Sequence, residues 1–330
     1  MNLHKIGQRK NSCWVFLLAF ALGSASLLLG QHVWRLSASC EQKYDLLNPS
    51  LPCGTSKGQG EWQYEPLRNT IIKTIDDFKS AGTVMHVSVY FRELDNGPRF
   101  GIEEYEKFYP ASLLKVPVMI AILHVADRQP SLLQEKLTYS GSLAEIANVE
   151  EPDETILQNT PYTVRELLQK MIQYSDNDSK NLLVRKLNIL PPPTVYDTFL
   201  DLGIVSMMDG STPYVSIQQY AYLFAVLYNA GYLSEEMSQH ALSLLSQTSY
   251  KDGLVAGVPR SVRVAHKFGY RILPDGERQL HDCGIVYHPS TPYVLCVMTS
   301  GSAIKSDASA IAEISRIVYD QITSLRVENN

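Results

Sequence analysis

The 330-residue chain lacks the residue spacings that are typical of protein metal sites. Its eight histidines include no H-x-x-x-H pair, and its five cysteines include no C-x-x-C pair. Zinc sites usually take their ligands from such closely spaced pairs. We therefore predict no metal and no other cofactor.

Concentrated positive charge is absent as well. The net charge is −5 at pH 7, and no run of consecutive Lys and Arg is longer than a pair. A nucleic-acid-binding surface needs clustered Lys and Arg because it must neutralise phosphate groups. These features exclude nucleic acid as a partner.

Residues 13–30 form an apolar run without a charge, and the run is about as long as a bilayer span requires. Lys5, Arg9 and Lys10 precede it, and basic residues favour the cytoplasmic side of a membrane. We therefore predict that residues 1–12 are cytoplasmic and that residues 13–30 form a single-pass signal anchor in the cell membrane. The rest of the chain is then extracytoplasmic.

Cleavage is the alternative to an uncleaved anchor. Ser37, Ala38 and Ser39 form an acceptable small-residue cleavage site, but Trp34 and Arg35 lie between this site and the apolar run. Cleavage there would release a secreted protein. We favour the uncleaved anchor.

Behind the anchor, the sequence predicts a linker and one folded domain. Residues 31–62 are predicted to be the linker, because much of this stretch is rich in Pro, Gly, Ser and Lys and shows little periodicity. Residues 63–326 are predicted to form the domain. With 45% hydrophobic residues, the chain can bury a sizeable core. We expect the domain to be a monomer.

The first patterns of the domain predict a helix and two antiparallel strands. Apolar residues recur at helical spacing over residues 67–78. Residues 84–91 alternate as in a strand, and a turn at residues 95–97 leads to a second strand at residues 100–102. The inward face of the first strand is expected to consist of Met85, Val87, Val89 and Phe91.

The middle of the domain predicts helices, and its C-terminal third predicts strands. Thr163 with Glu166, Ser216 and Ser234 are expected to cap helices, which gives Glu166 a structural role. Three strands follow at residues 262–270, 279–287 and 292–300, and Ser306 is expected to cap a last helix. The predicted fold class is α+β: a five-stranded antiparallel sheet flanked by the first and last helices, with an inserted all-helical half.

A serine and a lysine begin the most apolar of these helices. Ser112 and Lys115 form a Ser-x-x-Lys motif that begins two residues after Pro110. Residues three apart share a helix face, so the Lys115 amine can reach the Ser112 hydroxyl, and the helix start favours developing negative charge. The motif predicts an activated serine, and the alternative is an ordinary pair of surface residues.

Two further motifs follow in order. Ser175-Asp176-Asn177 lies on a loop between two predicted helices, and Lys267-Phe268-Gly269 lies in a predicted strand. By itself the first of these could be a capped loop without chemistry. Together with Ser-x-x-Lys, the three motifs resemble those of the class A β-lactamase and penicillin-binding serine hydrolase family.

This resemblance implies a role for each matching residue. Ser112 would be the acylated nucleophile, Lys115 its general base, and Ser175 the proton donor to the leaving nitrogen. Lys267 would attract a substrate carboxylate and lower the pKa of Lys115. Substrate-binding positions are implied at Asn177, whose amide would also hold Lys115, at Gly269, and at Tyr270, whose backbone N–H would form an oxyanion hole with that of Ser112.

The sequence departs from the family pattern at two points. Phe268 occupies a position that is usually Thr or Ser, whose hydroxyl helps to hold the substrate carboxylate. No glutamate occurs between Asn177 and Thr212, although hydrolytic relatives use one there to activate the deacylating water. The available acids are Asp178, Asp197, Asp201 and Asp209.

The resemblance and the predicted anchor together imply a membrane-tethered serine hydrolase that is acylated by β-lactams or related cell-wall amides. The missing glutamate predicts slow deacylation. The alternatives are a D,D-peptidase or esterase on the same fold, and a non-turnover β-lactam-binding sensor or pseudoenzyme.

The cysteines outside the apolar run fall into two neighbouring pairs, and an exported protein can form disulfides. Cys40 is near Cys53, and Cys283 is near Cys296. The last two flank a predicted turn almost symmetrically, so we expect them to lie opposite each other on adjacent strands. They are either disulfide-bonded or reduced core residues.

Overall fold

The computed structural model describes residues 44–48, 64–95, 97–140, 155–190, 195–204 and 214–327. All of them belong to one compact unit, residues 44–330. The predicted cytoplasmic segment 1–12, the anchor 13–30, Cys40 and Cys53 lie outside these ranges, as does most of the linker 31–62. Within the described ranges, no helix combines the length and the hydrophobicity that crossing a bilayer requires.

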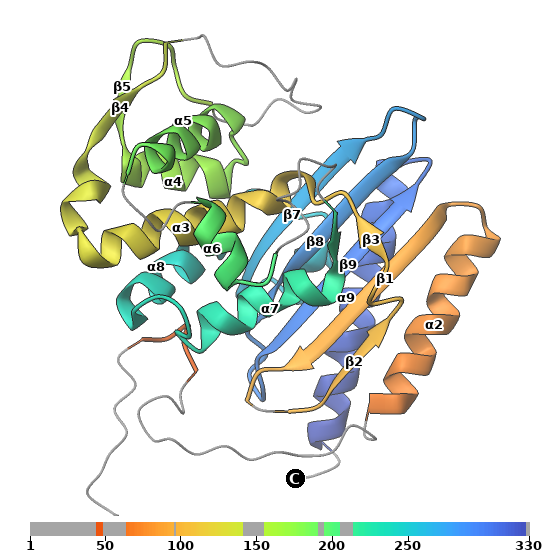
Figure 1. Ribbon diagram of the computed structural model, residues 1–330. Helices are drawn as coiled ribbons and strands as arrows, with labels where there is room; N and C mark the ends of the chain where they lie inside the picture. Colours follow the sequence, from red (N-terminus) through yellow and green to blue (C-terminus); the bar gives the residue numbers. More distant parts are fainter. Residues whose placement is uncertain are drawn as a thin grey trace, which may run out of the picture. The chain divides into compact units, whose positions relative to one another are not determined.

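A five-stranded antiparallel sheet is the centre of the described unit, as predicted, and its strand order is β2-β1-β9-β8-β7 (Figure 1). The outer strands β2 and β7 come from opposite ends of the domain sequence. This order requires the N-terminal and C-terminal parts of the domain to fold together. The strands are β1 (Val84–Glu93), β2 (Arg99–Ile102), β7 (Val264–Ile272), β8 (Arg278–Val286) and β9 (Tyr293–Gly301).

The start of β1 corrects one predicted side-chain orientation. Met85 is 47% exposed, whereas Val84 and Val87 are buried. The pairing of β1 with β9 is irregular between Val84 and His86, which is where an extra residue enters the strand. Such a bulge shifts the alternation by one position, so the prediction that Met85 faces inward is wrong.

Helices α2 (Glu65–Ser80) and α9 (Ile304–Val327) pack against each other and cover one face of the sheet (Figure 1). The predicted cap of the last helix is wrong, because α9 begins two residues before Ser306. The backbone N–H groups of Ser306 and Asp307 donate to the Ala303 carbonyl at 3.0 and 3.2 Å. These backbone bonds start the helix before Ser306, so its side chain is not the cap.

The other face of the sheet carries the helical half. Its helices begin at the predicted caps, because Thr163 and Ser216 form capping boxes and Ser234 accepts a hydrogen bond from the Met237 N–H. The helices are α3 (Lys115–Arg128), α4 (Val164–Gln173), α5 (Asn177–Asn188), α6 (Val195–Asp201), α7 (Ile217–Tyr228) and α8 (Glu235–Leu245), with 3₁₀ turns η2 (Ala111–Leu114), η3 (Pro130–Gln134) and η5 (Leu254–Gly257).

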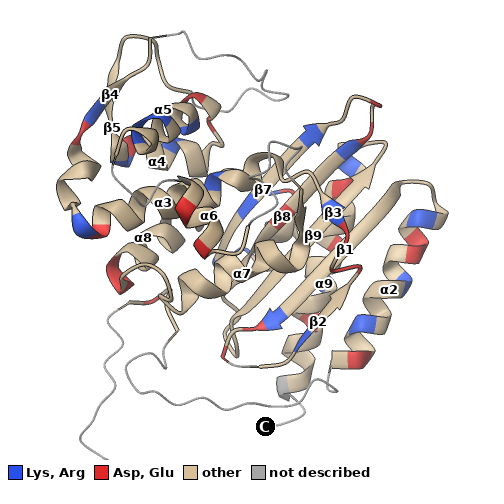
Figure 2. Ribbon diagram, in the orientation of Figure 1, with Lys and Arg blue, Asp and Glu red and all other residues tan. Residues whose placement is uncertain are grey.

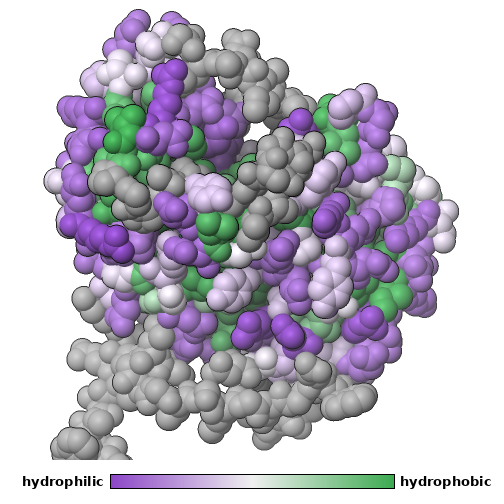
Figure 3. Space-filling view, in the orientation of Figure 1, coloured by the Kyte–Doolittle hydropathy of each residue, from purple (hydrophilic) through white to green (hydrophobic). Residues whose placement is uncertain are grey.

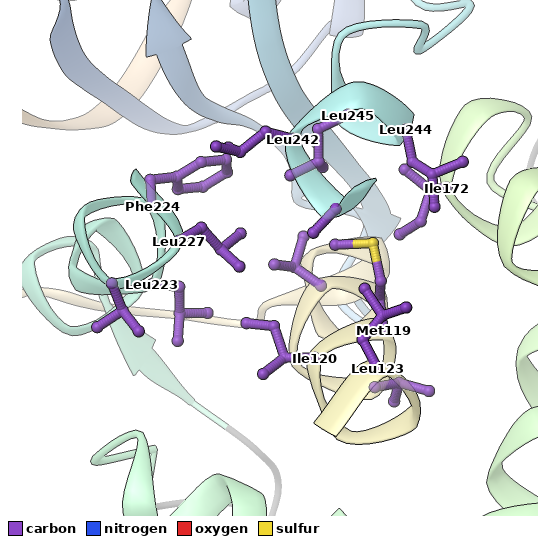
Figure 4. Close-up of a cluster of buried hydrophobic side chains, with 14 of the residues drawn as sticks. Met119, Ile120, Leu123, Ile172, Leu223, Phe224, Leu227, Leu242, Leu244 and Leu245 are labelled. Carbon is purple, nitrogen blue, oxygen red and sulfur yellow. The ribbon is translucent and has the colours of Figure 1, made fainter. Parts of the chain in front are cut away.

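Helix α3 lies at the centre of this half, and almost all of its side chains are buried. Figure 4 shows Met119 and Ile120 of α3 pointing toward side chains of α7 and α8. Burying each such side chain contributes roughly 1.5–3 kcal/mol. The apolar core therefore fixes the position of α3 and of the turn before it.

On the face shown in Figure 3, hydrophilic side chains predominate and hydrophobic ones show in small separate groups.

Two short strand pairs were not predicted. Strand β3 (Lys107–Phe108) pairs with β6 (Val215–Ser216), and β4 (Lys136–Thr138) pairs with β5 (Pro161–Thr163). Strands of two or three residues are too short to show an alternating pattern. The first pair joins the segment before η2 to the start of α7.

Cys283 and Cys296 lie directly opposite each other on β8 and β9, as predicted. Their Cα atoms are 4.0 Å apart, both residues are fully buried, and the two sulfur atoms form a disulfide. Cys283 is also the register partner of Lys267 on β7. The disulfide therefore joins β8 to β9 directly beside the strand that carries Lys267.

Residues 44–48, inside the predicted linker 31–62, pack on the domain. Leu46 and Leu47 are buried. The Tyr287 hydroxyl donates to the Leu46 carbonyl, and the Asn48 N–H donates to the Tyr228 carbonyl, both at 2.9 Å. The composition of this segment does not indicate these contacts, because their partners lie far away in the sequence.

Gly257→Ala is expected to destabilise the fold by about 1–3 kcal/mol through overpacking. The added methyl group would lie 2.3 Å from the Ala312 carbonyl oxygen and 2.5 Å from Ser315 Cβ, in the contact between η5 and α9. Gly231→Ala is the matched control, since its methyl group would lie 3.7 Å from the nearest atom. Urea denaturation measures both variants, and equal midpoints would contradict the prediction.

Candidate active site

The turn η2 positions Ser112 directly before α3. The Leu113 N–H donates to the Pro110 carbonyl at 2.9 Å, which closes a 3₁₀ turn. Ser112 therefore lies in this 3₁₀ turn. The sequence predicted the first turn of the α-helix instead. The buried Tyr220 hydroxyl of α7 donates to the Leu113 carbonyl at 2.9 Å and supports the turn.

The amine of Lys115 reaches the hydroxyl of Ser112, as predicted. Lys115 is 1% exposed, and its Nζ donates to Ser112 Oγ at 2.9 Å. The same Nζ donates to the Ser175 carbonyl and, at 3.1 Å, to Ser175 Oγ. A buried amine within hydrogen-bond distance of a serine hydroxyl is suited to accept its proton.

Ser175 lies between α4 and α5 in a strained backbone conformation with φ of +60°. Such a conformation in a residue other than glycine costs free energy and often marks a functional site. Here both the carbonyl and the hydroxyl of Ser175 contact Lys115. The sequence predicted that Asn177 lies on a loop, but it is the first residue of α5. The helix begins there because Asp176 caps it by accepting from the Ser179 N–H.

Lys267 completes the cluster from β7. It is fully buried, and its Nζ donates to Ser175 Oγ at 3.1 Å and to the Phe268 carbonyl at 3.0 Å. The Ser175 hydroxyl thus contacts the amines of both Lys115 and Lys267. The structure brings together the four residues that the sequence predicted to be catalytic.

Burial and like charge lower the pKa of both lysines. Burial lowers the pKa of Lys115 well below its ordinary 10.5, and the charges of Lys267 and Lys180 lower it further. Burial also lowers the pKa of Lys267 to about 7, although the Asp282 carboxylate opposes this shift. These shifts favour a neutral amine at Lys115, which a general base requires.

Gly269 allows β7 to pack against η2. A Cβ atom at this position would lie 2.9 Å from the Pro110 carbonyl oxygen and 3.1 Å from the Leu113 nitrogen. Any larger residue would push the strand away from the turn. This close packing places Tyr270, the next residue of β7, beside the segment that carries Ser112, but the predicted oxyanion hole remains a prediction.

A supporting layer on β8 was not predicted. His281 Nε2 donates to the Tyr109 carbonyl at 3.0 Å, and Gln279 Oε1 accepts from the Tyr109 N–H at 3.1 Å. Burial lowers the pKa of His281 to about 4, so the imidazole is neutral. These contacts depend on strand register between distant segments, so no local sequence signal indicates them.

Phe268 places an aromatic ring beside the lysine cluster. Its ring stacks on Tyr250 with centroids 4.3 Å apart, and Lys267 Nζ lies 4.1 Å from the Phe268 centroid. The cation–π contact stabilises the charged amine. The Phe268 side chain supplies no hydroxyl to this part of the site.

The structure describes three of the four acids that the sequence offers for deacylation. Asp201 Oδ2 accepts from the Tyr232 hydroxyl at 2.9 Å, and the Tyr232 ring stacks on His124 in the C-terminal half of α3, whereas Ser112 precedes α3. Asp178 and Asp197 lie in the first turns of α5 and α6. Asp209 and the landmark Thr212-Pro213 lie outside the described residues.

Glu166 has the predicted capping role at the start of α4. Its carboxylate accepts from the Thr163 N–H at 2.7 Å. The N–H and the hydroxyl of Thr163 both donate to this carboxylate and lower the pKa of Glu166, so it is charged at neutral pH. These contacts assign Glu166 to the helix start and not to the chemistry at Ser112.

Metal-ligating side chains do not gather in the part of the chain that the structure describes. No three His, Cys, Asp or Glu side chains come together there as a metal site would require.

Comparison with known proteins agrees with this arrangement. Residues 67–322 match the model of the Beta-lactamase enzyme family, named Beta-lactamase2. No curated protein sequence matches the chain significantly.

Solved structures share the fold at low identity. PBP-A is 22% identical with a TM-score of 0.67, and the match covers 82% of this chain and 98% of PBP-A. A beta-lactamase from Chitinophaga pinensis is 21% identical with a TM-score of 0.66, covering 77% of this chain and 100% of its own. The TLA-1 extended-spectrum beta-lactamase is 20% identical with a TM-score of 0.66, and the match covers 78% of this chain and 98% of the TLA-1 chain.

The lowered pKa of Lys267 predicts a pH dependence of stability. Between about pH 7 and pH 10.5 the unfolded chain binds a proton at this lysine that the folded chain does not. The free energy of unfolding should therefore rise with pH in this window, with a contribution of up to about 1.4 kcal/mol per pH unit. Lys267→Met should reduce the slope by about that amount.

Denaturation at several pH values between about 7 and 10 measures this slope. Lys73→Met is the control, because Lys73 is exposed on α2 and should leave the slope unchanged. An unchanged slope in Lys267→Met would show that Lys267 keeps its ordinary pKa.

Proposed function

Because the chain belongs to the beta-lactamase enzyme family, we propose that this beta-lactamase-like serine hydrolase is acylated at Ser112 by β-lactams or related cell-wall amides. The observation that carries the proposal is the hydrogen-bonded cluster in which Lys115 contacts Ser112 and the Ser175 hydroxyl contacts both lysines. This cluster contains a nucleophile, a base and a route for the proton.

Acylation begins when the neutral Lys115 amine takes the proton of the Ser112 hydroxyl. The Ser112 oxygen then attacks the amide carbonyl carbon and forms a tetrahedral intermediate with a negatively charged oxygen. The backbone N–H groups of Ser112 and Tyr270 are the proposed donors to this oxyanion. Losing one such donor typically costs a factor of about 100 or more in rate.

Collapse of the intermediate breaks the carbon–nitrogen bond and requires a proton on the leaving nitrogen. Lys115 passes its proton to Ser175 Oγ, 3.1 Å away, as the Ser175 hydroxyl gives its own proton to the nitrogen. Lys267 donates to the same hydroxyl and holds it in place. The acyl group then remains on Ser112.

Substrate recognition is assigned to Lys267 and Asn177. The Lys267 amine attracts the substrate carboxylate, and the Asn177 amide binds the substrate amide carbonyl. Phe268 supplies no hydroxyl for the carboxylate. A substrate without that carboxylate, as in a D,D-peptidase or esterase reaction, is therefore the second candidate.

Deacylation is proposed to be slow. The interval from Asn177 to Thr212 contains no glutamate to activate water, and general-base assistance is worth about 10²–10⁴-fold in rate. One of the similar structures is an acyl-enzyme complex of a PBP-A mutant with penicillin G. A long-lived acyl-enzyme would also suit a β-lactam-binding sensor.

The site is proposed to face the extracytoplasmic side of the cell membrane, on a monomeric domain that residues 13–30 anchor. The apolar run and its basic N-terminal flank support the anchor. The disulfide between Cys283 and Cys296 fits an oxidising compartment. Cleavage of the run would make the same domain a secreted protein.

Ser112→Ala is expected to abolish covalent labelling by a fluorescent penicillin while leaving the fold intact. Lys115→Ala should reduce the acylation rate by about 10²-fold or more, because the base is lost. Intact-mass spectrometry measures the adduct, and thermal denaturation checks the fold. Full labelling of Ser112→Ala would place the nucleophile elsewhere.

Acylation and turnover are expected to separate in time. Product release should show a burst of about one equivalent followed by a slow steady state, because deacylation lacks a positioned base. Stopped-flow spectroscopy with a chromogenic cephalosporin measures both phases. Rapid turnover without accumulated acyl-enzyme would contradict slow deacylation, and Asp201→Asn and Asp209→Asn would then identify an overlooked base.

A further inference from the structure

A cavity lies at the edge of the sheet opposite β7, the strand that packs against the turn of Ser112. It has a volume of about 340 Å³ and lies between the β1–β2 hairpin, the end of α6 and one side of α7. Strand β2 is the edge strand opposite β7, which carries Lys267, so this cavity is separate from the acylation site (Figure 1). Its size suits a small molecule.

Two arginines form one wall of the cavity. Arg92 of β1 and Arg99 of β2 are direct register partners, and Figure 2 shows basic residues on these neighbouring strand ends. Both face the helical half, because Tyr90, two positions earlier on β1, is buried in its core.

The guanidinium of Arg92 is available for a ligand. Among the described residues, no hydrogen bond or ion pair involves the Arg92 side chain, which is only partly buried. Arginine binds carboxylates through two parallel hydrogen bonds. The wall therefore has the chemistry of a carboxylate site.

The lining of the cavity also carries a negative charge. Asp201, at the end of α6, lines the cavity, and its Oδ2 atom accepts from the Tyr232 hydroxyl. The buried residues Ala221, Ala225 and Val294 supply an apolar part of the lining. A ligand that fits has a carboxylate, an amino group and a short apolar part.

We propose that this cavity binds a small zwitterion, either a free α-amino acid or a dipeptide. Arg92 binds its carboxylate, Arg99 adds positive charge to the same wall, and Asp201 binds its ammonium group. Binding here does not depend on acylation at Ser112. It adds a non-covalent ligand site to the domain.

Isothermal titration calorimetry of the full-length chain tests the proposal with alanine and alanylalanine in both chiral forms. Propionate and ethylamine are the partial analogues, which carry only one of the two charges. We expect saturable binding of at least one zwitterion and weaker binding of both analogues. Arg92→Gln and Asp201→Asn should each weaken zwitterion binding about tenfold or more, the usual effect of losing a charged hydrogen bond.

Arg260→Gln is the matched control, because Arg260 is exposed and does not line the cavity. It removes the same charge and should leave binding unchanged. Arg99→Gln gives a second test if Arg92→Gln lowers the midpoint of thermal unfolding. Labelling of Ser112 by penicillin should stay at the wild-type rate in the three arginine variants.

Three outcomes would overturn the proposal. They are no saturable binding of any zwitterion, equal binding by Arg92→Gln, Arg99→Gln and the wild type, and binding of propionate as tight as that of the zwitterions. Loss of binding in Ser112→Ala would instead place the ligand in the acylation site and would also reject the proposal.

Discussion

The contact of two buried lysines with one serine hydroxyl is the interaction on which the site depends. Lys115 and Lys267 both donate to Ser175 Oγ at 3.1 Å, and both are almost completely removed from water. Two ammonium groups that contact the same hydroxyl repel each other, and burial makes the repulsion stronger. At least one amine is therefore driven toward its neutral form, which is the form that can accept a proton from Ser112.

This contact exists only because two parts of the fold meet at one place. Lys115 belongs to the helical half and Lys267 to the sheet, so a small movement between the two would separate them. Gly269 lets β7 lie against the turn η2, and Tyr220 supports that turn through the Leu113 carbonyl. The dense cores on both sides of the sheet thus serve to hold the distances among three polar side chains.

The sequence predicted most of the fold because its main signals are local. Helix caps such as Thr163 and Ser216 satisfy backbone groups within a few residues of themselves, and their boundaries were correct. Errors arose where backbone bonds or strand pairing override the local pattern. The bulge after Val84 exposes Met85, and backbone bonds to Ala303 start the last helix before Ser306.

The sequence by itself determined which residue types the candidate site contains: the serines and lysines of the three motifs, Phe268 without a hydroxyl, and an interval after Asn177 without a glutamate. These are properties of residue types at fixed spacings, which a chain carries before it folds. Only the tertiary structure decided the distances, the burial that lowers the lysine pKa values, the support from His281, and the charged cavity at the far edge of the sheet. Each of these depends on residues that are far apart in the chain and meet only when the core packs.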